Sequence, residues 1–133
     1  MVVEPQVQKA LRNIDNPDFS VRKKAIQALA RARYEPAVPR LTKMFYDDTQ
    51  HERVRAIIAR ALGRIGTDDC FHALVHVLSQ IDPATLKRQI VVGDDHSETY
   101  QLHNTMLSVA ITVGLQMIGT KEARKILEAW RSG

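Results

Sequence analysis

Two histidines and a cysteine in the middle of the chain are the first residues whose types could do chemistry. His72 and His76 lie four residues apart, which places both imidazoles on one face of a helix, and Cys70 lies two residues earlier. Helical metal sites use such a spacing. The helical register turns Cys70 toward the core and both histidines outward, so the cysteine cannot join them as a ligand. Two ligands make an open, weak site, and we expect no metal here.

A second polar cluster, Gly93-Asp94-Asp95-His96-Ser97-Glu98, crowds carboxylates beside one imidazole. Such a group can bind a cation or exchange protons. Its spacing departs from that of calcium-binding loops, which alternate acids around a central glycine and end on a glutamate. Polar clusters are also typical of solvated loops, and we interpret this one as a loop.

Motifs for catalysis and for cofactors are missing from the sequence. It contains no Ser or Cys nucleophile motif, no glycine-rich phosphate cradle and no dinucleotide fingerprint. We therefore expect a protein that is not an enzyme and that holds no cofactor.

Length and composition favour a single all-α domain over residues 1–133. Apolar residues make up 44% of the chain but aromatic residues only 5%, so small aliphatic side chains must fill the core, as in closely packed helices. One cysteine cannot form an internal disulfide, and neither a secretion signal nor a bilayer-spanning segment is evident. These features predict a soluble, cytoplasmic protein. Its net charge of +4 permits an acidic partner or nucleic acid without selecting either.

The chain repeats itself. A shift of 33 residues superposes Leu29 on Leu62, and a shift of 53 superposes Leu62 on Leu115, each within a longer run of matching apolar residues. The third unit is therefore the second with 20 residues inserted before it, at about 82–101. A half unit that contains Val7 precedes the first.

Each unit has two apolar stripes with helical spacing, which predicts a helix pair. Prolines suit two first-turn positions, and two glycines suit helix ends, each followed by a threonine that can cap the next helix: Pro17, Pro36, Gly66-Thr67 and Gly119-Thr120. We expect a short helix near 83–89 in the insert, and further helices near 4–13, 17–32, 36–46, 51–65, 68–80, 102–118 and 120–131.

Two segments carry a family resemblance. Asn16-Pro17-Asp18 through Val21-Arg22-x-x-Ala25-Ile26-x-Ala28-Leu29, and Val54-Arg55 through Ala61-Leu62-Gly63-x-Ile65-Gly66, resemble HEAT-like repeats of the phycobilisome-lyase type. The resemblance implies a short, armadillo-like α-solenoid, an α-α superhelix of about three antiparallel helix pairs plus an N-terminal half repeat. It also implies that Arg22 and Arg55 tie successive repeats together. The matching position in the third unit is Ser108, which marks the last unit as specialised.

Two surfaces are candidates for binding a partner. Solenoids usually bind along the concave face, which the second helices line. The candidate residues there make its N-terminal end mildly basic: Lys9, Arg40, Lys43, His72 and His76.

The second candidate surface is an apolar stripe on the first helix of the third unit. The matching positions of the first two units are mainly polar or basic, but here they become Met106, Val109, Val113 and Met117. A large apolar side chain left in water forgoes about 1.5–3 kcal/mol. We expect the stripe to be buried, either beneath residues 86–92 of the insert or against a second protein chain, which includes a symmetric homodimer.

Three functions follow from these features. The leading hypothesis is a non-enzymatic adaptor or scaffold that binds an unidentified protein. The family resemblance implies an alternative, a phycobiliprotein chromophore lyase or its accessory subunit. The third, a basic solenoid that binds nucleic acid, lacks the basic groove studded with aromatic residues that stacking on bases requires.

Overall fold

The structure, a computed structural model, describes residues 4–81 and 95–132, with only the backbone described for 95–105. The described chain is all-helical and has no strand, which confirms the predicted fold class. Its helices are α1 (Pro5–Asn13), α2 (Phe19–Arg31), α3 (Val38–Tyr46), α4 (Glu52–Ile65), α5 (Asp68–Ser79), α7 (Asp95–Ile118) and α8 (Lys121–Ser132), with a 3-10 turn, η1 (Glu35–Ala37), before α3.

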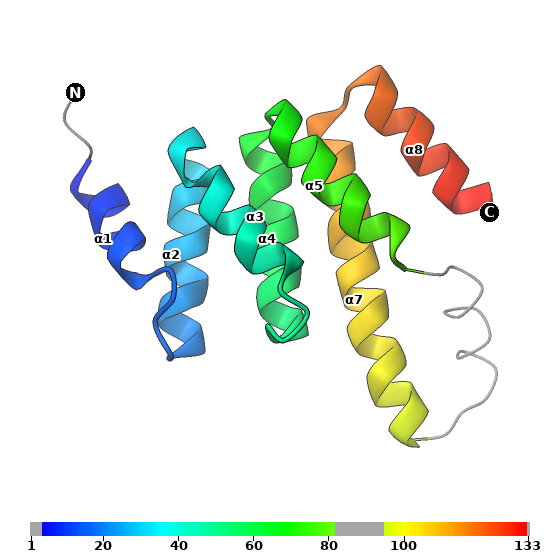
Figure 1. Ribbon diagram of the computed structural model, residues 1–133, viewed down its shortest axis with the longest axis horizontal. Coiled ribbons are helices and arrows are strands. Elements are labelled where there is room, and N and C mark those ends of the chain that lie inside the picture. Colours follow the sequence, from blue (N-terminus) through cyan, green and yellow to red (C-terminus); the bar gives the residue numbers. More distant parts are fainter. Residues whose placement is uncertain (1–3, 82–94, 133) are drawn as a thin grey trace.

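The helices follow one another along the long axis of the molecule in chain order, with α1 and α8 at opposite ends (Figure 1). The first helices of the three units, α2, α4 and α7, pack side by side, while α3 packs against α4 and α5, and α5 packs against α4 and α7. This is the predicted short solenoid. We call the outward side of α2, α4 and α7 the first-helix face, and the outward side of α1, α3, α5 and α8 the second-helix face.

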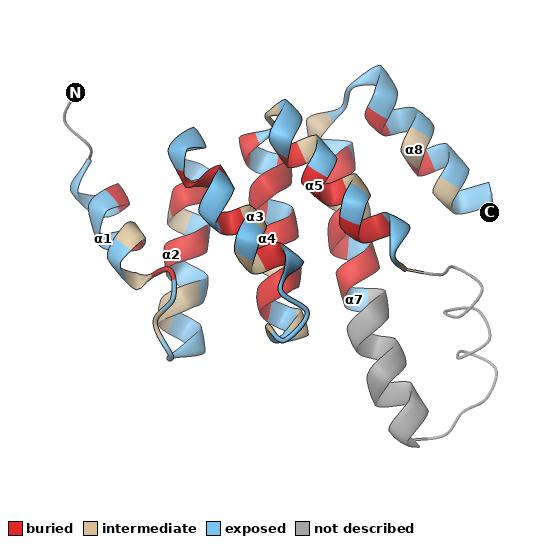
Figure 2. Ribbon diagram, viewed as in Figure 1, coloured by how far each residue is buried: buried red, intermediate tan, exposed pale blue. Residues whose placement is uncertain are grey.

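One continuous hydrophobic core runs through the solenoid, and the buried positions lie on the sides of the helices that face each other (Figure 2). The aligned residues Leu29, Leu62 and Leu115 are each 0% exposed. Their burial confirms the register that the internal repeat predicts.

The ends of the helices follow the predicted capping chemistry in the second and third units. Gly66 and Gly119 adopt left-handed φ angles of 75° and 68° after α4 and α7, a conformation that favours glycine. The next residue caps the following helix in both places: the Thr67 hydroxyl accepts from the Cys70 N–H at 3.3 Å, and that of Thr120 from the Ala123 N–H at 3.1 Å.

Two predicted helix starts were wrong. Pro17 lies before α2 rather than in its first turn, because Asp18 is the N-cap and its carboxylate accepts from the Val21 N–H at 3.3 Å. Helix α7 begins at Asp95 rather than near residue 102, so the polar segment expected to be a loop is helical from that point. Asp95 and Glu98 then lie in the first turn, where the helix dipole favours acids. The short helix expected at 83–89 lies outside the described residues.

Helices α4 and α7 pack together more extensively than any other pair in the described chain, and two glycines allow their backbones to meet. A Cβ atom added at Gly63 would lie 2.4 Å from the Gly114 Cα, and one added at Gly114 would lie 2.8 Å from the carbonyl oxygen of Ala59. Because both of these contacts are with backbone atoms, the rotation of a side chain cannot relieve them. The spacing between the second and third repeats therefore depends on these glycines.

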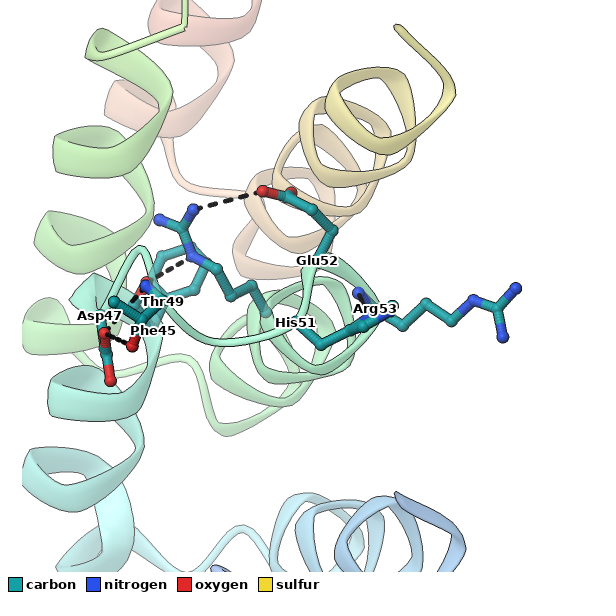
Figure 3. Close-up of polar contacts among 7 residues, drawn as sticks. Phe45, Asp47, Thr49, His51, Glu52 and Arg53 are labelled. Carbon is teal, nitrogen blue, oxygen red and sulfur yellow. Dashed lines mark hydrogen bonds and ion pairs between the residues drawn. The ribbon is translucent and has the colours of Figure 1, made fainter. Parts of the chain in front are cut away.

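The two repeated arginines connect neighbouring helix pairs, as the family resemblance implies. Arg22 Nη1 donates to Oε1 of Gln50, which lies in the loop before α4, at 3.0 Å. The partner of Arg22 is therefore Gln50 and not the nearby Asp18. Arg55 Nε donates to the Phe45 carbonyl oxygen at 2.9 Å, and its Nη1 lies 3.8 Å from a Glu52 carboxylate oxygen (Figure 3). Each arginine thus joins a first helix to the loop or helix end beside it.

The geometry of the loop between α3 and α4 can be tested by a pH titration. Asp47 Oδ1 accepts from the hydroxyl and the N–H of Thr49, at 2.6 and 3.0 Å, and these bonds hold the pKa of the Asp47 carboxyl below its ordinary value (Figure 3). A lowered pKa means that the loop gains stability above about pH 3.9 and loses it as the pH falls through the lowered value. We expect NMR titration to show this shift, and Thr49→Val to reduce it. An unshifted Asp47 in the wild type would contradict the loop geometry.

No helix that the structure describes combines the length and the apolar character needed to cross a membrane.

Candidate functional site

The histidines of α5 lie where the helical register places them. Both are exposed, whereas Cys70 is fully buried and its Sγ accepts from the Thr67 hydroxyl at 3.2 Å. The His76 ring packs against that of Tyr46, with 4.7 Å between the ring centroids. Among the described residues, no group of three His, Cys, Asp or Glu side chains is arranged to hold a metal ion.

The polar segment 93–98 lies outside the part of the chain whose side chains the structure describes. Gly93 and Asp94 lie outside the described residues, and so do the side chains of Asp95 to Glu98.

The candidate residues of the second-helix face are exposed on α1, α3 and α5. Arg40 is already engaged: its Nη2 lies 3.2 Å from an Asp15 carboxylate oxygen, and its Nη1 donates to the Leu11 carbonyl at 3.2 Å. These bonds connect α3 to the C-terminal end of α1. Of the candidate cations on α1 and α3, Lys9 and Lys43 therefore have no ion pair or hydrogen bond among the described residues.

The apolar stripe of α7 is largely exposed among the described residues. Met106, Val109 and Met117 are 38%, 46% and 47% exposed, and Val113 is half-buried. The described residues therefore do not bury the stripe as expected. Residues 86–92, which we expected to cover the stripe, lie outside them.

Sequence reasoning missed a groove on the first-helix face, where α2, α4 and α7 come together. Its volume is about 480 Å³, and its lining includes four cations, one amide and one methionine of the stripe: Lys23, Gln27, Arg31, Arg60, Arg64 and Met117. The signal in the sequence was the run of basic residues at the outward positions of the first two units. The repeat alignment shows that these positions are mainly polar or basic, but it does not show that their side chains line one groove.

Comparison with known protein families gives a match over the first two repeats of the chain. The sequence model of a protein family described as HEAT repeats matches residues 4–92, which include the N-terminal half repeat and the two complete helix pairs that follow. No curated protein and no solved structure matches the chain.

Proposed function

The chain belongs to the HEAT repeat family, and on that premise we propose that it is a non-enzymatic adaptor that binds another protein through the first-helix face of α7. HEAT repeats commonly serve protein interactions, because stacked helix pairs present long continuous surfaces. The observation that carries the proposal is the exposed stripe of Met106, Val109 and Met117.

The stripe differs from its counterparts in a way that points to a partner. At the matching positions, α2 exposes Ser20, Lys23, Gln27 and Arg31, and α4 exposes Arg53, Arg60 and Arg64 but buries Ala56, the counterpart of Val109. Single exposed apolar residues are ordinary on protein surfaces, but a row of them along one helix marks an interaction site. A second protein that covered the stripe would recover the hydration free energy of these side chains.

A second copy of the same chain is one candidate for this partner. A helix with an apolar stripe can pack on its own symmetry mate around a two-fold axis, so that one surface supplies both sides of the contact. Sedimentation across a range of concentrations separates this homodimer from a complex with a different protein.

The other surfaces and functions stay predictions. The second-helix face, with Lys9, Lys43 and the histidines of α5, is an alternative binding surface. The chromophore-lyase alternative is tested by binding of bilin to the purified chain, and the nucleic-acid alternative by salt-dependent binding of an oligonucleotide.

The test of the adaptor proposal is Val109→Lys. Val109 is exposed, so the variant should keep the melting temperature of the wild type. In the complex the new lysine charge would be buried, so the affinity should fall roughly tenfold or more. The loss is measured as lost dimer in sedimentation or as lost capture of the partner from native lysate.

Ala129→Lys is the matched control, because it adds the same charge at an exposed position of the second-helix face. It should leave association unchanged. Association that survives Val109→Lys but is lost in Ala129→Lys would assign the interface to the second-helix face. If both variants associate like the wild type, the proposed role of the stripe is wrong.

A further inference from the structure

The groove on the first-helix face has a composition that selects its ligand. Lys23 and Arg31 come from α2, and Arg60 and Arg64 come from α4, while no acidic residue is among its lining. Among the described residues, none of these four side chains forms an ion pair or a hydrogen bond. Positive charges gathered around one concave surface raise the local potential and attract anions.

Three of the four cations are arginines, and this favours particular anions. A guanidinium group presents its donors in a planar fork that matches a carboxylate or a phosphate with two parallel hydrogen bonds. Arg60 and Arg64 lie one helical turn apart on the exposed side of α4. They can therefore pair with acidic groups that are themselves about one helical turn apart.

The apolar part of the lining distinguishes a peptide from a nucleic acid. Ala30, Ile57 and Ala61 contribute apolar surface to the lining, and Met117 also belongs to the stripe of α7. A single-stranded nucleic acid binds by stacking its bases on aromatic rings, and the groove lining contains none. A peptide segment with acidic and apolar sides satisfies both parts of the surface.

We infer that this groove binds an acidic, amphipathic segment of the partner protein, whose carboxylates pair with Arg31, Arg60 and Arg64. Apolar side chains of the same segment then cover Met117 and continue along the stripe. The inference rests on the proposed adaptor function and adds to it the chemistry of the partner.

The probe for this site is a synthetic helical peptide with glutamates four residues apart on one face and leucines on the adjoining face. A second peptide replaces each glutamate with glutamine, and a third probe is a thymidine oligonucleotide. Fluorescence anisotropy on the full chain should show binding of the glutamate peptide, with the glutamine peptide about tenfold weaker or worse. Binding should also weaken as salt is added.

Arg60→Glu should weaken binding of the glutamate peptide about tenfold, and Lys23→Glu should act in the same direction. Arg124→Glu is the matched control, because it makes the same charge change at an exposed position of α8 and should leave binding unchanged. Melting temperatures near that of the wild type will show that the variants are folded.

Four results would overturn the inference: no binding of the glutamate peptide, equal binding of the glutamine peptide, undiminished binding by Arg60→Glu, or preferred binding of the oligonucleotide. The adaptor proposal is judged separately, by the effect of Val109→Lys on sedimentation and partner capture. If Val109→Lys disrupts association while Arg60→Glu affects neither peptide nor partner, the groove inference fails and the adaptor proposal stands.

Discussion

Gly63→Ala will lower the free energy of unfolding by about 1–3 kcal/mol, although a change from glycine to alanine inside a helix ordinarily raises it by about 0.5–1 kcal/mol. The difference comes from the partner helix. The new methyl group would lie 2.4 Å from the Gly114 Cα, and α4 and α7 must move apart to admit it. Their separation loosens the packing of the third repeat on the second, which outweighs the gain in helix propensity.

Chemical denaturation followed by circular dichroism measures this effect. Arg64→Ala is the control, because it introduces the same residue at the next, exposed position of α4 and should change stability by less than about 0.5 kcal/mol. A Gly63→Ala variant as stable as the wild type would show that α4 and α7 do not approach as closely as the structure has them.

Leu62→Ala will cost about 2–5 kcal/mol, the range found when a fully buried leucine is truncated and leaves a cavity. Leu62 is 0% exposed at the centre of the continuous core, between the first and third repeats. Because each helix pair buries its apolar surface only against its neighbours, the loss should destabilise the array as a whole.

The only tryptophan of the chain allows this cooperativity to be measured. Trp130 packs against the core from α8, far along the chain from Leu62. Its fluorescence should change at the same denaturant concentration as the helical signal, in both the wild type and Leu62→Ala.

Leu62→Met is the control for side-chain shape, because it conserves volume and should cost less than about 1.5 kcal/mol. A loss of under about 1 kcal/mol in Leu62→Ala would contradict the packing at the centre of the solenoid.

Local features of the sequence were sufficient to predict the repeat, the helix pairs and most of the core. Leu29, Leu62 and Leu115 are buried because helical periodicity turns them to one side, and that periodicity can be counted in the sequence. The ends at Gly66 and Gly119 were predicted for the same kind of reason. A left-handed glycine and a capping threonine act on their immediate neighbours, so their effect needs no knowledge of the rest of the fold.

The start of α7 shows where local reasoning was too coarse. A cluster of acids and a histidine is typical of a loop, but the helix dipole also favours acidic side chains in the first turn of a helix. The segment contains no proline to end a helix between Asp95 and Ile118, and α7 spans all of it.

Only the tertiary structure determined what depends on the separation between helices. No local pattern in the sequence pairs Gly63 with Gly114, yet their contact sets how closely α4 approaches α7. The candidate site was predicted only in part for the same reason. Periodicity placed Met117 on an outward face, but it could not place Lys23 of α2 and Arg60 of α4 in one groove beside it. Helical period is a property of neighbouring residues, whereas a groove between three helices exists only after they have packed.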